Sequence, residues 1–92
     1  MAEPAFTLKL IAPDGSTKEH AVVAVTAPGE LGRLGILAHH APLVTTLERG
    51  LLVWRAPEGP TQQQELPGGL LEVRDNVVIV LASAVTAPTR PR

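Results

Sequence analysis

Proline and glycine recur at short intervals along this chain, and their spacing leaves little room for helices. The 92 residues include 8 glycines and 9 prolines. No window of about 11 residues carries a helical stripe of apolar side chains without one of these two residues interrupting it. The segments between them are short, and turn residues separate them about every 8–12 positions. The chain is therefore predicted to fold as an all-β sandwich or barrel.

Individual strands are located by the alternation of apolar and polar residues and by β-branched side chains. Phe6–Ile11 alternates, and a turn containing Gly15 should return the chain as a hairpin into residues 17–26. One face of this second run is expected to carry His20, Val22, Ala24 and Thr26. We expect a loop at 27–32, a short apolar segment at 34–37, a tight turn at 74–76, and further strands at 43–47, 51–55, 62–66, 70–73 and 77–82.

The composition predicts one domain with an aliphatic core. Hydrophobic residues make up 45% of the chain, but there is only one Phe, one Trp and no Tyr. Trp54 is expected to pack in the core, and His20, alone on its strand, is expected to have a structural role. We expect residues 1–86 to form the domain and residues 87–92, rich in Pro and Arg, to form a flexible tail.

Charge and cysteine content exclude several classes of function. The formal net charge is −1, so no basic excess is present to bind the phosphates of a nucleic acid. The chain has no cysteine, which removes disulfides, thiolate catalysis and cysteine metal sites. The longest apolar run, residues 77–82, is far shorter than the roughly 20 residues that a membrane-spanning helix requires.

Two glycine-containing motifs stand in order along the chain. The first reads Gly32-Arg33-Leu34-Gly35-Ile36-Leu37, continues with His40-Ala41-Pro42-Leu43 and Thr45, and closes at Gly50. The second reads Pro67-Gly68-Gly69-Leu70-Leu71-Glu72-Val73. Together they resemble the two signatures of the epsilon subunit of F-type ATP synthases, and the resemblance covers most of the chain.

This resemblance implies a fold and a role. The fold would be an all-β sandwich of about ten strands. The role would be that of a non-catalytic subunit of the central stalk, which binds the gamma subunit and the c-ring and helps to couple ion flow to ATP synthesis. The protein would then be peripheral, held through the complex at the cytoplasmic face of the bacterial inner membrane.

The C-terminal end of the chain limits what the resemblance implies. Most relatives continue into a helical hairpin, which can inhibit ATP hydrolysis and in some members binds ATP. This chain ends at Arg92, soon after the expected sandwich. We therefore expect assembly and coupling, with little or no inhibition by a helical arm, no nucleotide binding and no cofactor.

The resemblance also implies where the partners would bind. The loop around residues 30–33 and the bend around residues 38–41 would face the c-ring and gamma. The expected contact residues are Glu30, Leu31, Arg33, Leu34, His39, His40 and Pro42. Relatives often carry an acidic residue where Arg33 stands, and Pro-Gly or Pro-Asn where Ala38-His39 stands, so both surfaces are altered in this chain.

The paired histidines also suggest an alternative, a cupin-like metal protein. The metal motif of a cupin is loosely matched by Gly35, His39, His40, Glu48 and Gly50. However, cupin histidines are separated by one residue so that both point inward, whereas adjacent strand residues point to opposite faces. No histidine follows residue 40 to complete the second cupin motif. A further alternative is a β-sandwich binding or scaffold module unrelated to ATP synthase.

Overall fold

The computed structural model describes residues 3–83, and these residues form nine strands and no helix. The strands are β1 (Phe6–Ile11), β2 (Thr17–Val22), β3 (Ala24–Gly29), β4 (Gly32–Ile36), β5 (Leu43–Leu47), β6 (Gly50–Arg55), β7 (Thr61–Leu66), β8 (Gly69–Arg74) and β9 (Val77–Ala82). The all-β prediction is confirmed. The predicted tail at 87–92 and the domain boundary at residue 86 lie outside the described residues.

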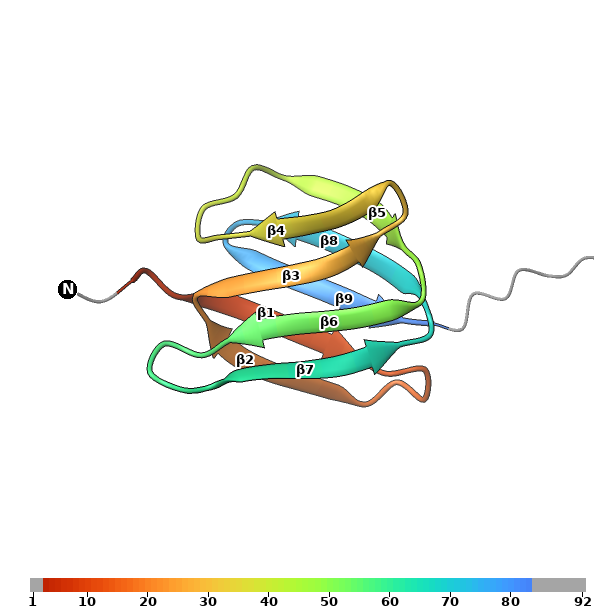
Figure 1. Ribbon diagram of the computed structural model, residues 1–92, viewed down its shortest axis with the longest axis horizontal. Coiled ribbons are helices and arrows are strands. Elements are labelled where there is room, and N and C mark those ends of the chain that lie inside the picture. The colour runs from red at the N-terminus through yellow and green to blue at the C-terminus, as the bar shows by residue number, and fades with distance from the viewer. Residues whose placement is uncertain (1–2, 84–92) are drawn as a thin grey trace, which may run out of the picture.

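The nine strands belong to one sheet that curls back on itself. Its order is β2-β1-β9-β8-β5-β3-β6-β7, and β4 pairs with β3 beside this path. Figure 1 shows the result as two layers, with β3, β4, β6 and β7 in front of β1, β2, β8 and β9. Most neighbours are antiparallel, but β1 and β9, which come from opposite ends of the described chain, run parallel. The sandwich is thus one curled sheet.

The alternation predicted one strand over residues 17–26, but the structure has two strands there. The chain bends at Val23, where β2 ends and β3 begins. Val22 and Val23 are both buried, so the alternation shifts by one residue. Beyond the bend Val25 and Ala27 are buried, instead of the predicted face of Ala24 and Thr26. The reason is tertiary, because β2 pairs with β1 in one layer and β3 pairs with β6 in the other.

The predicted loop at 27–32 is also wrong. β3 continues to Gly29 and β4 starts at Gly32, which leaves only Glu30 and Leu31 as the turn between them. Pro28 is tolerated because β3 changes neighbours at this point: it pairs with β6 up to Thr26 and with β5 at Gly29. The missing N–H of proline therefore falls where no ladder bond is required on that side.

The remaining strands lie where they were predicted. β5 and β9 have the predicted bounds, β6 and β7 begin one residue earlier than predicted, and β8 is one residue longer at each end. The β1–β2 hairpin is confirmed. The β8–β9 turn places Asp75 and Asn76 at φ values of 51° and 65°, which is the left-handed pair of a type I′ hairpin turn.

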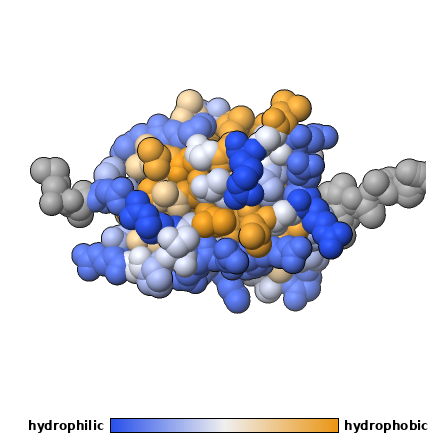
Figure 2. All heavy atoms as spheres, in the orientation of Figure 1, coloured by the Kyte–Doolittle hydropathy of each residue, from blue (hydrophilic) through white to orange (hydrophobic). Residues whose placement is uncertain are grey.

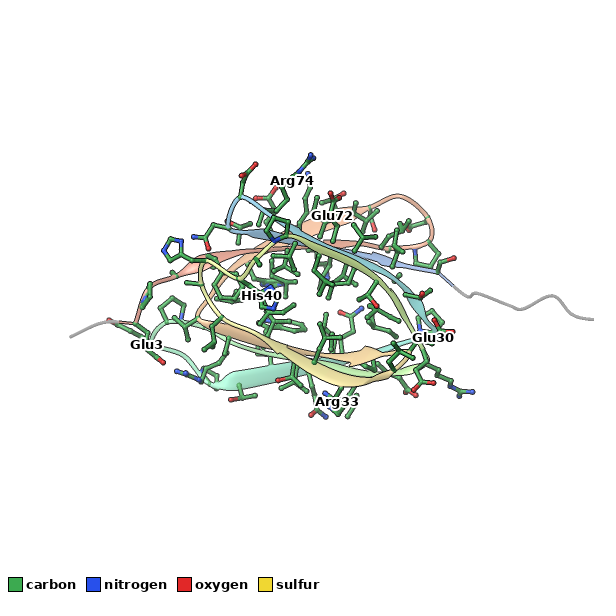
Figure 3. The ribbon with its side chains drawn as sticks, turned by 90° about the horizontal axis from the view of Figure 1, so that it is seen from above. Glu3, Glu30, Arg33, His40, Glu72 and Arg74 are labelled. Atoms are coloured by element: carbon green, nitrogen blue, oxygen red, sulfur yellow. The ribbon has the colours of Figure 1, made fainter. Side chains whose placement is uncertain are left out.

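The space between the layers is filled by aliphatic side chains, as the composition predicts (Figure 3). Leu8, Leu52, Leu71 and Val80 are completely buried. Trp54 is also in this core, and its ring stands 5.0 Å from that of His20. The expected packing role of Trp54 is therefore confirmed, and His20 covers the tryptophan from β2.

An exposed ion pair ties the N-terminal segment to β6. Arg55 donates from both terminal nitrogens to the carboxylate of Glu3, at 2.9 and 3.1 Å. The hydrogen bond from Arg55 lowers the pKa of Glu3, and the same contact raises the pKa of Arg55. The pair fixes the start of the described chain beside the front layer, before β1 enters the back layer.

Candidate functional site at the two ends of β4

The structure divides the expected contact residues between the two ends of β4. Glu30 and Leu31 form the β3–β4 turn, and Arg33 follows near the start of β4. His39, His40 and Pro42 lie in the β4–β5 connection at the other end of the strand (Figure 1). β4 has five residues, so at about 3.3 Å per residue the two groups are separated by roughly 16 Å. We call them the β3–β4 tip (residues 30–33) and the β4–β5 corner (residues 38–42).

The β3–β4 tip presents a bare apolar side chain on a constrained backbone. Leu31 is 100% exposed, the highest value among the exposed large apolar residues of the described chain. Gly32 has a φ of +127°, which an L side chain rarely adopts. A Cβ on Gly29 would stand 2.5 Å from Leu34 Cδ2 and 2.7 Å from the carbonyl oxygen of Gly32. The turn is also tied to β5, because the Glu30 N–H donates to the Thr46 carbonyl at 3.1 Å.

Arg33 and Leu34 point to opposite sides of the front layer. Arg33 lies on the outer side (Figure 3), where its Nη2 donates to the Leu51 carbonyl at 3.1 Å. Figure 2 shows this face, on which hydrophobic surface is interrupted by hydrophilic side chains. Leu34 is half-buried and packs against the core. A change at Leu34 would therefore alter the fold together with any contact.

The β4–β5 corner is held by hydrogen bonds rather than by strand pairing. His39 has a φ of 65°, and its N–H donates to Asn76 Oδ1 at 2.7 Å. The N–H of His40 donates to the Leu37 carbonyl at 3.2 Å. The Nδ1–H of His40 donates to the Ala41 carbonyl at 2.7 Å, so the ring is turned back onto its own backbone. The two histidines thus lie in a turn. The argument against a cupin that adjacent strand residues point to opposite faces therefore does not apply to them.

Asn76 is the residue that sequence reasoning missed. It was assigned only to the β8–β9 turn, but its side chain also fixes the corner 37 residues earlier in the chain. No local pattern reveals this contact. A left-handed Asn in a turn is common, and the bond depends on two connections meeting at the same end of the sandwich.

Replacing Asn76 separates the contribution of its left-handed backbone from that of its side-chain hydrogen bond to His39. Asn76→Gly keeps the left-handed backbone but removes the bond to the His39 N–H, and should cost about 1 kcal/mol of unfolding free energy. Asn76→Ala adds the strain of a positive φ and should cost about 1 kcal/mol more. Urea unfolding measures both values. Equal losses in the two variants would show that backbone strain contributes nothing at this turn.

Among residues 3–83, no group of three or more His, Asp or Glu side chains is arranged to hold a metal ion. Over the same residues the structure contains no helix with the length and apolarity to cross a membrane. The β4–β5 corner is thus a polar turn with His39 exposed, and it lies at the other end of β4 from the exposed leucine of the β3–β4 tip.

Comparison with known proteins identifies relatives along nearly the whole chain. Residues 5–88 match the family described as ATP synthase, Delta/Epsilon chain, beta-sandwich domain. The ATP synthase epsilon chain of Carboxydothermus hydrogenoformans is 44% identical over 77 residues, which are 84% of this chain and 57% of the relative. That of Pelotomaculum thermopropionicum is 39% identical over 84 residues, or 91% of this chain and 62% of the relative. The chain thus spans little more than half the length of these curated relatives.

Solved structures with the same fold come from ATP synthases. A chain in the Euglena gracilis mitochondrial ATP synthase, a structure of OSCP, F1 and c-ring, superposes with a TM-score of 0.78 at 31% identity; the match covers 87% of this chain and 52% of that one. A chain in the central stalk and c-ring of the Tetrahymena thermophila mitochondrial ATP synthase superposes with a TM-score of 0.69 at 17% identity. The match covers 89% of this chain and 66% of that one, and at this identity it shows the fold alone.

These matches decide between the alternatives raised by the sequence. The epsilon chain of ATP synthase is a structural and regulatory subunit and not a catalytic one. The family match follows the same two glycine-containing motifs that suggested it, and it leaves neither the cupin nor the unrelated scaffold with support. By its β-sandwich domain, the chain belongs to the delta/epsilon chain family of ATP synthases.

Proposed function

We propose that this chain is a non-catalytic subunit of an ATP synthase central stalk, bound to gamma and resting on the c-ring. It would be peripheral, attached through the complex at the cytoplasmic face of the bacterial inner membrane. Beyond the family match, the observation that supports this function is the bare side chain of Leu31. Burying a leucine in a partner stabilises a complex by about 1.5–3 kcal/mol. A leucine on a constrained turn also loses little backbone freedom on binding, so it is suited to a protein contact.

The spacing of the two contact regions supports a subunit with two partners. The β3–β4 tip and the β4–β5 corner lie at opposite ends of one short strand. One chain could therefore meet gamma at one end and the c-ring at the other. The close-packed aliphatic core between the layers resists compression, which suits a part that transmits torque when ion flow turns the rotor.

Co-purification tests the proposed function directly. The chain would be used to capture its native gamma subunit, with c subunits retained in a mild detergent, and the captured proteins would be identified by mass spectrometry. We expect gamma to be recovered with the c subunits. A folded chain that captures no gamma would contradict the proposal and would return the scaffold alternative.

Leu31→Asp tests the role of the tip. The substitution places a charge where an apolar contact is proposed, and it should weaken binding to gamma or the c-ring by about tenfold or more. Because Leu31 is fully exposed, the stability of the free chain should not change. Binding is measured by titration, and stability by thermal unfolding.

Pro57→Asp is the matched control for this prediction. Pro57 is exposed at the β6–β7 turn, the tip of another hairpin, so this change adds the same charge without touching either contact region. It should leave binding unchanged. If both variants bind as the original chain does, the tip is not part of the interface.

A further inference from the structure

β7 is the last strand of the curled sheet, and within residues 3–83 no strand pairs with its second edge. It pairs with β6 along its whole length, Thr61–Leu66, and is the terminal strand of the order in which β2 stands at the other end. Figure 1 shows it at the lower margin of the front layer. Residues 61–65 are all exposed, although alternate side chains of β6, its neighbour in this layer, are buried. A row of backbone N–H and C=O groups therefore lies open to another strand.

This edge has few of the features by which natural edge strands avoid pairing. Proline, lysine and bulges are the usual devices. β7 contains no proline or lysine, and its register with β6 continues for six residue pairs without a bulge. Its only charge is Glu65, near its end. By contrast, the other terminal strand, β2, carries Lys18 and Glu19 in its exposed part.

We propose that β7 pairs in the antiparallel direction with β7 of a second copy of this chain. The two-fold axis would pass through Gln63, so that this residue lies opposite the partner's Gln63. Gln62 then lies opposite the partner's Gln64, and Thr61 opposite the partner's Glu65. The front layer of one copy and the front layer of the other would then form one continuous sheet.

A second copy is favoured because the strand is complementary to itself. A two-fold interface uses the same surface twice, so each group must match its own symmetry mate or a neighbour on the same strand. The glutamine amide both donates and accepts hydrogen bonds, so two facing glutamines satisfy one another. The register also separates the like charges, because each Glu65 faces a threonine rather than the partner's Glu65.

This inference goes beyond the proposed function and does not depend on it. None of the expected contact residues lies on β7, and the β3–β4 tip and β4–β5 corner belong to other strands. Pairing through one short strand buries a small area, so the dimer should be weak and concentration-dependent. It would concern the free chain, before or apart from assembly with other subunits.

Two substitutions on β7 should shift the dimer in opposite directions. Gln63→Lys places two like charges opposite each other at the axis and should weaken dimerisation by about tenfold or more. Thr61→Lys creates two cross-strand pairs with the partner's Glu65 and should tighten it several-fold. Within the chain, Thr61 lies opposite Arg55, whose charge is already paired with Glu3. Thr17→Lys, on the exposed edge strand β2, is the matched control and should change nothing.

Sedimentation equilibrium of the full chain at concentrations from about 10 μM to 1 mM tests the proposal. Circular dichroism would first show that each variant is folded. A dimer that responds in these two directions supports the β7 register. A chain that remains monomeric at about 1 mM overturns the proposal. So does a dimer that is insensitive to Gln63→Lys, or one that Thr17→Lys affects equally. Capture of gamma by the Gln63→Lys variant separates a failure here from a failure of the proposed function.

Discussion

Gly69→Ala should destabilise the fold by about 3 kcal/mol or more. Gly69 begins β8 with a φ of +150°, a conformation that is strained for any residue with a Cβ. An added Cβ would also overlap the carbonyl oxygen of Leu81 on β9 and stand 3.2 Å from the Cα of Ala82. These are backbone atoms of a paired strand, so the clash is relieved only by separating β8 from β9. The loss is measured as the unfolding free energy in urea.

Gly35→Ala is the internal control for this result. Gly35 lies in β4, and a Cβ added there would meet nothing within 4 Å. Alanine should therefore be tolerated or should stabilise the chain by up to about 1 kcal/mol, because it restricts the unfolded state. Equal losses at the two glycines would contradict the geometry described for Gly69.

Leu71→Ala should cost about 2–5 kcal/mol of unfolding free energy. Leu71 lies in the middle of β8, is completely buried, and is paired with Thr45 on β5 and Val80 on β9. Its removal leaves a cavity where the two layers meet, in a domain with few aromatic residues to fill the space. The midpoint of urea unfolding should fall while the slope of the transition stays the same, since the same surface is exposed on unfolding.

The neighbouring leucine provides the comparison. Leu70 precedes Leu71 on the same strand but points outward and is 43% exposed. Leu70→Ala removes the same atoms and should cost no more than about 0.5–1 kcal/mol. A similar loss for both residues would mean that the outer face of β8 is packed as tightly as the core, contrary to the two-layer arrangement.

Two features could be predicted from the sequence because they depend on neighbours along the chain. β5 and β9 lie where apolar and β-branched residues are flanked by turn residues, and the Asp75–Asn76 turn follows from residues that accept a positive φ. The two glycine-containing motifs likewise identified the family that the comparisons show. These properties are local, so a linear pattern contains them.

The errors arose where the alternation of side chains conflicts with a change of layer. Val22 and Val23 are both buried because the chain crosses between the layers at that point, and a strictly alternating pattern cannot represent the crossing. Pro28 led to the prediction of a loop. The proline is tolerated because β3 exchanges β6 for β5 as its neighbour nearby, and only the pairing of distant strands shows this.

The same distinction applies to the candidate site. The sequence by itself determined the all-β class, the aliphatic core and the family, since these follow from composition, short-range periodicity and motif order. It placed the expected contact residues in a loop around residues 30–33 and a bend around residues 38–41. Only the tertiary structure decided that they form a tip and a corner at opposite ends of β4, that Leu31 is bare while Leu34 is packed, and that Asn76 holds His39. The physical reason is that exposure and long-range hydrogen bonds depend on which strands the curled sheet brings together, and residues far apart in the chain set that arrangement.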